Sequence, residues 1–373
     1  MRQFPASPIT ALIDEKPRYY LGESMAHDLT VAGLLGPDGM AGLAEVKLGY
    51  GTSAGEPALR AQVAARLGIP DSQVLITAGA AGALFLTGLL CGDGEILVGR
   101  PCFPPTFDAL RGLGAPVVTV HSRFDDGYRI DLDAFASNLS PRTQLVMFAS
   151  PQNPAGVSIT ADEVEQMLAA MSRTCPEALL LIDETFREAT YGDAPPAASF
   201  AGMSPRLLTC ASLSKAYGVP GLRVGWLTAP GPALYEQLRL AKFNSSIACG
   251  TIDEFLAIQA LAHADQLLAE RGAVLAEARG IVERWIKAHT GRLRWLRPEA
   301  GAFCCMQLDP GAFGPADIDR FHAYLAGERA QIAAGPWFGD NASVIRIGLG
   351  YEAAGKLEQG LEVISAALET APR

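Results

Sequence analysis

Short apolar runs alternate with amphipathic segments from about residue 56 to residue 230. Five of these runs have the length of strands and are apolar on both faces, as strands buried in a parallel sheet are. They are Val74–Thr77, Glu95–Val98, Val117–Val120, Leu145–Phe148 and Leu179–Ile182. The segments between them are typical of crossover helices, one of which begins at Thr160, a residue that can cap it. The pattern predicts an α/β fold with a doubly wound, mainly parallel sheet and ligand-binding loops at the carboxyl ends of its strands.

The pattern changes after Gly250, where one long helical run is followed by short strand-like runs and a closing helix. These segments are Glu254–His289, Leu293–Leu296, Ala302–Met306, Val344–Ile347 and, approximately, Leu357–Leu368. We therefore expect a second, smaller α+β domain. The predicted division is an N-terminal arm (1–30) that belongs to the small domain, a large domain (31–263) and the remainder of the small domain (264–373).

The composition limits the partners of this 373-residue chain. Forty acidic residues against thirty basic ones give a net charge of −10, which argues against binding to nucleic acid or to an anionic membrane. The start, Met1–Pro5, lacks the apolar run of a signal peptide, and no apolar stretch approaches transmembrane length. We therefore expect a cytoplasmic location, with charged ligands bound by local clusters.

Cysteine and histidine spacing argues against a structural metal. The seven cysteines are scattered without a C-x-x-C motif, which fits reduced thiols better than disulfides or zinc ligands. The five histidines also lack the spacing of metal ligands.

Lys215 is the most informative residue for chemistry. The apolar run Leu207–Ala211 is predicted to be a strand that carries the lysine into the interior. A buried lysine loses proton affinity through desolvation, and its neutral amine can condense with an aldehyde. The alternative is a strand end with a single unpaired cation.

The residues around Lys215 form a motif. Ser212 and Ser214 precede the lysine, and Arg223 follows it by eight positions. This spacing resembles the pyridoxal-phosphate lysine motif of the class I and II aminotransferases. The resemblance implies a fold type I enzyme, with a large domain and a smaller α+β domain, and pyridoxal 5'-phosphate as the cofactor. It also implies that Lys215 is the Schiff-base lysine, that Ser212 and Arg223 bind the cofactor phosphate, and that Ser214 assists them.

Asp183 directly follows an apolar run, so its carboxylate is expected where a parallel strand ends. A buried acid needs a cationic partner, because an unpaired buried charge is energetically costly. In the family that Lys215 and its serines resemble, the matching aspartate pairs with the protonated pyridine nitrogen of the cofactor. A helix cap ahead of Glu184 and Thr185 is the alternative.

Asn153 follows the Leu145–Phe148 run in a segment rich in Asn, Pro and Gly, which is also typical of a plain turn. In the family, the matching asparagine hydrogen-bonds the phenolic oxygen of the cofactor and lies beside the substrate. The asparagine, the aspartate, the lysine motif and the arginine follow one another in the family's order. Together they are more specific than any one of them.

Small residues and one aromatic residue complete the predicted cofactor site. Gly79, Ala80 and Ala81 follow the first predicted strand, where amides at a helix start can approach a phosphate. The family has its phosphate cup at this place. Phe103 is similar in position to the aromatic residue that stacks on the pyridine ring. The alternatives are a tight turn without a ligand and an ordinary core phenylalanine.

Arg346 is the only cation in the apolar strand that ends near Leu349, and a buried guanidinium can clamp a planar carboxylate. The resemblance makes the substrate α-carboxylate its partner, and an internal salt bridge is the alternative. Gly22 matches the arm segment that closes over the substrate, although Ser24 replaces the family's usual proline. Tyr50 matches the tyrosine that reaches the phosphate of the neighbouring subunit, which implies a homodimer with shared sites. Otherwise Tyr50 anchors a loop.

One position departs from the family pattern. Where aminotransferases commonly have Asp-x-x-Tyr, this chain has Asp183 followed by Phe186. The missing hydroxyl would have donated a hydrogen bond to the cofactor phenolate. Tyr191 lies five residues farther along and is not expected to replace it. Phe186 therefore weakens the case for ordinary transamination but leaves the cofactor prediction unchanged.

The expected activity is that of an aminotransferase acting on an amino acid and a 2-oxo acid, with Lys215 moving the α-proton. Alternatives on the same fold are a lyase, a decarboxylase, or an oxidase or hydroxylase of an amino acid. A distant alternative is a non-catalytic regulatory module that binds the cofactor, but the sequence has neither a DNA-binding domain nor a broken lysine motif. The preferred substrate side chain is not predicted, because variable loops form those contacts.

Overall fold

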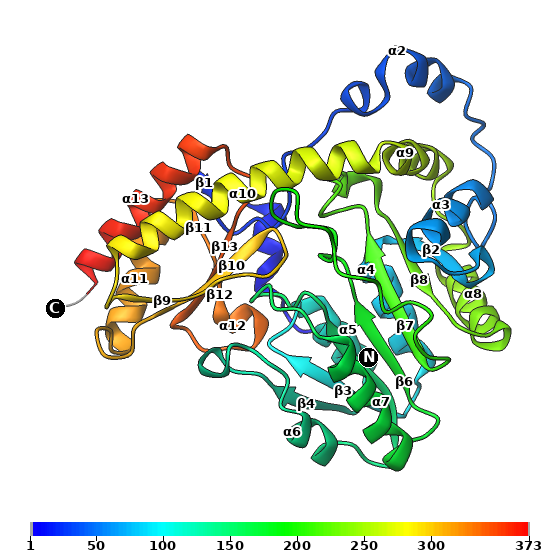
Figure 1. The fold of residues 1–373 in the computed structure, drawn as a ribbon, viewed down its shortest axis with the longest axis horizontal. Helices are drawn as coiled ribbons and strands as arrows, with labels where there is room; N and C mark the ends of the chain where they lie inside the picture. Colours follow the sequence, from blue (N-terminus) through cyan, green and yellow to red (C-terminus); the bar gives the residue numbers. More distant parts are fainter. Residues whose placement is uncertain (1–2, 372–373) are drawn as a thin grey trace.

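The computed structural model describes residues 3–371, without the side chains of residues 37 and 38. A seven-stranded sheet forms the centre of the fold, in the order β2-β8-β7-β6-β5-β3-β4 (Figure 1). Its strands are β2 (Val74–Ala78), β3 (Glu95–Arg100), β4 (Val117–His121), β5 (Thr143–Ala149), β6 (Leu179–Asp183), β7 (Leu207–Ser212) and β8 (Val224–Thr228). The strands β3 to β7 run parallel to one another, and β8 is antiparallel to both of its neighbours.

The predicted, mainly parallel sheet is confirmed, with one difference in pairing. The run at Val74 was interpreted as a strand of a parallel sheet, but β2 is an edge strand whose only neighbour is the antiparallel β8. The strand β8 itself was not predicted, because its residues belong to the stretch that also carries Arg223.

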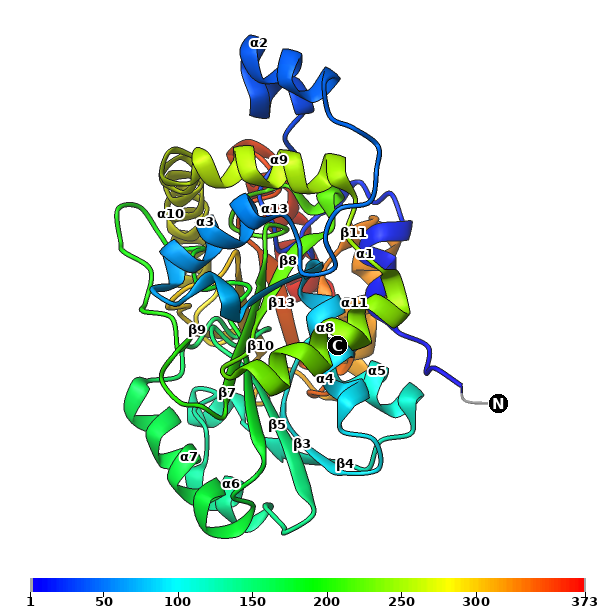
Figure 2. The same cartoon turned by 90° about the vertical axis from the view of Figure 1, so that its right-hand side faces the viewer.

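Helices cover both faces of this sheet (Figure 2). One face packs against α4 (Gly79–Leu90), α5 (Pro104–Leu113) and α8 (Pro232–Ser246), and the other against α6 (Leu132–Ser137) and α7 (Ala161–Thr174). Successive residues of a strand alternate between the faces, so Met147 joins the first core and Val146 the second. Thr160 caps α7 as predicted. Its hydroxyl accepts a hydrogen bond from the Glu163 amide at 3.1 Å, and the Glu163 carboxylate accepts one from the Thr160 amide at 2.7 Å.

A second, antiparallel sheet of four strands forms from the C-terminal part of the chain. Its order is β12-β13-β10-β9, with β9 (Leu293–Leu296), β10 (Phe303–Leu308), β12 (Ala333–Ala334) and β13 (Val344–Gly348). The accompanying helices are α11 (Pro315–Gly327), α12 (Gly335–Phe338) and α13 (Ala354–Thr370). The expected long helical run is two helices, α9 (Thr251–Ala262) and α10 (Ala264–Ala288), which meet at His263.

The N-terminal arm lies against this second sheet. After η1 (Pro8–Thr10) and α1 (Ala11–Asp14), β1 (Tyr19–Tyr20) pairs in parallel with β11 (Ala330–Gln331). The Gly348 amide at the end of β13 donates to the Leu21 carbonyl at 2.8 Å. The arm is thereby held beside the strand that carries Arg346.

The next helix, α2 (Val31–Ala44), projects from the body beside α9 (Figures 1 and 2). It is followed by α3 (Pro57–Leu67), and short 3₁₀ turns lie at η2 (Asp71–Gln73), η3 (Phe124–Asp126) and η4 (Pro220–Leu222). None of the helices within residues 3–371 is long and apolar enough to cross a membrane.

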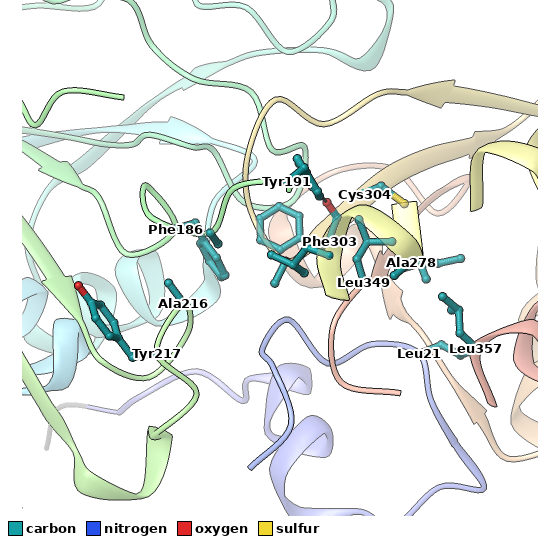
Figure 3. Packing of buried hydrophobic residues seen from close by; sticks show 14 of the residues in the cluster. Leu21, Phe186, Tyr191, Ala216, Tyr217, Ala278, Phe303, Cys304, Leu349 and Leu357 are labelled. Atoms are coloured by element: carbon teal, nitrogen blue, oxygen red, sulfur yellow. Dashed lines mark hydrogen bonds between the residues drawn. The ribbon is translucent and has the colours of Figure 1, made fainter. Parts of the chain in front are cut away.

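A continuous apolar cluster joins the two sheets (Figure 3). Phe186, from the loop after β6, meets Phe303 of β10 edge to face, with ring centroids 4.7 Å apart. Leu21 of the arm packs into the same cluster near Leu357 of α13. Burial of each such side chain contributes roughly 1.5–3 kcal/mol, so this cluster fixes the arm and both sheets relative to one another.

Candidate active site

A cavity of about 740 Å³ opens at the carboxyl ends of the central parallel strands. It is lined by residues from three parts of the chain: the arm, the loops after the strands of the large sheet, and β13 with the segment behind it. Ten of the predicted site residues line it: Ala80, Ala81, Phe103, Asn153, Asp183, Ser212, Ser214, Lys215, Arg223 and Arg346. The topology therefore places most of the predicted site residues around one cavity.

Lys215 lies just beyond the end of β7, with its amine in the cavity. Its Nζ donates a hydrogen bond to Ser24 Oγ at 3.2 Å and lies 5.7 Å from the centroid of the Phe186 ring. Burial lowers the pKa of Lys215 to about 8, with Arg346 adding to the effect and Glu23 opposing it. More of this amine is therefore neutral, and nucleophilic, near neutral pH than in an exposed lysine.

Asp183 is the last residue of β6, and its Oδ1 accepts the Thr185 amide at 2.9 Å. The carboxylate thus caps the following turn and also lines the cavity. Burial raises the pKa of Asp183, while the hydrogen bond from Thr185 and the charge of Lys215 lower it. A cationic ligand group in the cavity would offset this desolvation.

Arg223 forms a cluster of anion-binding groups with Ser214 and the start of α4. Its Nη1 donates to Ser214 Oγ at 3.2 Å. Gly79 has a φ of +67°, and a Cβ added there would lie 2.6 Å from Arg223 Nη2, so only glycine allows the guanidinium to come this close. The Ser212 hydroxyl accepts the Ser214 amide at 3.3 Å. Hydroxyls, a guanidinium and helix-start amides together suit a phosphate.

Arg346 lies in the middle of β13 and is only 1% exposed. Its Nη1 donates to Asn153 Oδ1 at 2.8 Å, and its Nη2 donates to the Gly22 carbonyl. Burial lowers the pKa of Arg346 to about 10. Its Nε is buried without a hydrogen-bond partner, and no acid within residues 3–371 forms an ion pair with it. A carboxylate ligand would provide the missing acceptor.

The hydroxyl that Phe186 lacks is not supplied by Tyr191. The Tyr191 hydroxyl donates to the Gly301 carbonyl at 2.7 Å, and the residue belongs to the apolar cluster shown in Figure 3. Phe186 itself lines the cavity and packs against Phe303. The expectation that Tyr191 does not replace the missing donor is confirmed.

Three predicted residues, Gly79, Gly22 and Tyr50, do not line the cavity of this chain, although Gly79 adjoins the Arg223 guanidinium. Gly22 lies directly behind the cavity and reaches the site through its carbonyl, which accepts from Arg346. Tyr50 is 88% exposed, in the loop between α2 and α3, and has no contact with the cavity of its own chain.

The sequence pointed to the arm only through Gly22, and several residues on the arm side of the cavity were not predicted. Tyr20, Glu23 and Asp28 of the arm line it, together with Tyr351 after β13. The centroids of the Tyr20 and Tyr351 rings lie 5.3 Å apart. These residues stand outside the predicted strands, and the sequence signals in this segment were the resemblance at Gly22 and the replacement of proline by Ser24.

Comparison with known proteins gives a consistent family. The protein-family model described as aminotransferase class I and II matches residues 20–354. Capreomycidine synthase of Streptomyces vinaceus is 30% identical, over 99% of this chain and 95% of the relative. An arginine–pyruvate transaminase of Pseudomonas aeruginosa is 31% identical, over 80% of this chain and 77% of the relative.

Solved structures agree with this result. The PLP-dependent cyclase OrfR has a TM-score of 0.83 and 26% identity, covering 99% of this chain and 98% of its own. A PLP-dependent aminotransferase from Streptococcus suis has a TM-score of 0.84 at 24% identity, covering 96% of this chain and 95% of its own, and this likeness shows the fold. The fold is thus that of a fold type I pyridoxal-phosphate enzyme. The chain belongs to the class I and II aminotransferases.

The residues of the cavity fit pyridoxal phosphate. Gly79 leaves the room that Arg223 needs at the anion cluster, Lys215 has a lowered pKa, and Asp183 is an acid buried beside the cavity. An anion-binding cluster, a nucleophilic amine and a buried carboxylate match the phosphate, the aldehyde and the ring nitrogen of this cofactor.

Proposed function

We propose that this chain transfers an amino group between an amino acid and a 2-oxo acid, with Lys215 as the lysine that binds the cofactor. The proposal rests on one observation: a single cavity is lined by Lys215, Asp183 and the buried Arg346. The family match supports the same activity.

The cofactor side of the proposal uses the large sheet. Ser212, Ser214 and Arg223 bind the phosphate together with the amides of Gly79, Ala80 and Ala81 at the start of α4. Asp183 pairs with the ring nitrogen, Phe103 covers one face of the ring, and Asn153 donates to the phenolic oxygen. When bound, pyridoxal phosphate supplies an electron sink for the substrate α-carbon.

The substrate side of the proposal uses β13 and Lys215. Arg346 binds the α-carboxylate through its free Nε and through the guanidinium N–H groups that do not donate to Asn153 or Gly22. This orients the α-carbon toward Lys215, whose amine accepts the α-proton and later returns it.

We further propose that the substrate side chain carries a positive charge. The arm side of the cavity holds the carboxylates of Glu23 and Asp28 and the rings of Tyr20 and Tyr351. Within residues 3–371 neither carboxylate forms an ion pair. Carboxylates and tyrosine faces both attract a guanidinium or an ammonium group.

Two of the three other cationic residues in the cavity wall already contact other side chains, whereas Lys16 of the arm forms no ion pair within residues 3–371. Arg129 pairs with Glu299 and donates to the Ser158 carbonyl, and the Arg100 guanidinium stacks 4.2 Å from the Phe107 ring centroid. A relative whose name states arginine as its amino donor is consistent with this choice of substrate.

A substrate panel tests both proposals. With pyruvate as acceptor, arginine and lysine should give a higher kcat/KM than leucine or aspartate. Asp28→Asn should raise KM for arginine roughly 1.4- to 5-fold, because an exposed ion pair contributes about 0.2–1 kcal/mol, and should leave KM for leucine unchanged. Keto-acid and ammonia release are measured together. Equal values for all four amino acids would contradict the cationic substrate, and a lack of keto acid from every donor would contradict transamination.

A second candidate function is elimination or ring closure on the same substrate. Two observations favour it: Phe186 removes the hydroxyl that aminotransferases commonly have, and a synthase and a cyclase are among the similar proteins. Both reactions begin with the same α-proton transfer by Lys215.

Phe186→Tyr separates the two candidates. The pKa of the coloured linkage between lysine and cofactor should fall, because the new donor stabilises the adjacent phenolate. A spectrophotometric pH titration measures this, with Phe186→Leu as a control that adds no donor and should show no fall. If keto-acid formation also rises relative to side products, the second candidate replaces the first. An unchanged pKa would mean that another donor already occupies this oxygen.

We also propose a homodimer in which Tyr50 completes the site of the neighbouring subunit. Its 88% exposure leaves it free to do so, and large apolar side chains are exposed on the same side of the molecule near α8 and α9. They are Leu48, Phe243, Ile247 and Ile252. Exposed apolar groups gathered in this way are typical of an interface.

Mixed dimers test the sharing of sites. Lys215→Ala and Tyr50→Ala chains are each expected to have low activity alone. When equal amounts are unfolded and refolded together, about half of the dimers are mixed and each of these has one complete site of two, so the mixture should regain about a quarter of the wild-type activity. Each variant refolded alone is the control. If mixing restores nothing, Tyr50 serves its own chain or none.

The division into an arm (1–30), a large domain (31–263) and the rest of a small domain (264–373) remains our proposal, supported by the two separate sheets. We also propose a cytoplasmic location, supported by seven cysteines that are all unpaired.

A further inference from the structure

Ser24 is the residue of the arm that lies nearest to the reactive amine. Its Oγ accepts a hydrogen bond from Lys215 Nζ at 3.2 Å, and its side chain is only 3% exposed. Within residues 3–371 no other side chain forms a hydrogen bond with Nζ. The contact joins two segments that lie 191 residues apart in the chain.

The backbone around Ser24 is fixed from two directions. Gly348 donates to the Leu21 carbonyl at 2.8 Å, and Arg346 donates to the Gly22 carbonyl. Both donors belong to β13, so the strand that offers the guanidinium also sets the position of the Ser24 hydroxyl.

Two departures from the family sequence face Lys215. Ser24 stands where proline is usual, and Phe186 stands where tyrosine is usual. Phe186 offers only a ring face, 5.7 Å from Nζ, and cannot hydrogen-bond to the amine. The hydroxyl that hydrogen-bonds to the lysine is therefore on the arm.

We propose that Ser24 is a positioning residue, which holds the Lys215 amine in place while this amine is free to move the substrate α-proton. The inference rests on the proposed function. A hydroxyl both donates and accepts. It can therefore donate to the neutral amine before the proton arrives and accept from the ammonium group afterwards. Proline and phenylalanine side chains can do neither.

The proton balance of the step is simple. The bond between Cα and its hydrogen breaks, its electron pair stays with the substrate carbon, and the proton forms a new bond to Lys215 Nζ. The same proton leaves Nζ later, so the lysine and Ser24 are unchanged at the end. Ser24 exchanges no proton itself. It limits the rotation of a flexible four-carbon side chain, which increases the fraction of time the amine is aligned.

Exchange of the substrate α-hydrogen with D₂O, followed by NMR, tests the proposal directly. Ser24→Ala should slow exchange roughly ten- to a hundred-fold, the range for a lost hydrogen bond to a charged group, with KM nearly unchanged. Ser24→Thr keeps the hydroxyl and should retain most of the rate. Ser24→Cys keeps the volume but donates and accepts weakly, and should behave as Ser24→Ala.

A second readout uses the protein without cofactor. The rate at which Lys215 attaches added pyridoxal phosphate should rise with pH as the amine loses its proton, and we expect its midpoint below that of an exposed lysine because burial lowers the pKa of Lys215. The charged groups that act on this amine are Glu23 of the arm, Asp183 of β6, Arg346 of β13 and Arg223 after η4. None of them changes in the variants, so a lower midpoint in Ser24→Ala and Ser24→Cys, but not in Ser24→Thr, reports the loss of the acceptor itself.

The outcomes separate this inference from the proposed function. If the wild-type protein exchanges the α-hydrogen of no amino acid, the proposed function fails. If the wild type exchanges it and Ser24→Ala and Ser24→Cys match the wild type in both rate and midpoint, Ser24 has no positioning role. If all three variants lose exchange equally, Ser24 acts through packing, and the inference is overturned.

Discussion

Lys215→Ala should reduce transamination by at least about 10³-fold, because a single residue is expected both to bind the cofactor covalently and to move the α-proton. The wild-type protein with pyridoxal phosphate should be yellow, and borohydride should attach the cofactor irreversibly to Lys215. A peptide map after reduction identifies the labelled lysine. Turnover is measured as keto-acid formation with each amino acid of the panel.

Lys242→Ala is the matched control for this substitution. Lys242 is a buried lysine outside the cavity, and its Nζ donates to the Ser53 carbonyl at 2.8 Å. Its removal should lower the free energy of unfolding, because that carbonyl loses its partner, and should leave labelling at Lys215 intact. Labelling of any other lysine in the wild type would contradict the assignment.

Arg346→Ala should raise KM for the amino acid roughly 30- to 5,000-fold, since removing one partner of a buried charge pair costs about 2–5 kcal/mol. The absorption spectrum of the bound cofactor should stay near that of the wild type, because the anion cluster around Arg223 is unchanged. Arg346→Lys should not restore binding, since an ammonium group cannot present two parallel donors to a carboxylate.

Arg294→Ala is the corresponding control. Arg294 is an arginine of the same sheet that pairs with Asp125 outside the cavity, and its loss should leave KM unchanged. If Arg346→Ala has the KM of the wild type, the α-carboxylate is bound by another group. A loss of the cofactor spectrum in Arg346→Ala would instead show that the arginine supports the cofactor.

The central sheet could be predicted because its strands are apolar on both faces. That same property hides strand direction, which is why the edge strand β2 could not be distinguished from a parallel strand. The junction between α9 and α10 at His263 was not predicted because neither Gly nor Pro marks it.

The site could be predicted where its residues follow strands. Lys215 and Asp183 each follow an apolar run, and Arg346 interrupts one. The sequence therefore indicated that these three charged side chains are buried. Tyr20 and Asp28 could not be found in this way. The arm has only a two-residue strand, so its path across the cavity depends on pairing with β11, more than 300 residues later in the chain.

The order of these parts along the chain has a consequence for synthesis on the ribosome. The residues that we propose to bind the cofactor in the cavity of their own chain lie between Gly79 and Arg223, so they have emerged once the large sheet is complete. Arg346 and the partner strand of the arm are made much later. Because chains fold in the order in which they emerge, we expect the nascent chain to gain the groups for the cofactor first and the groups for the amino acid last. On this order, a nascent chain that still lacks β13 also lacks the arginine that we propose to bind the substrate α-carboxylate.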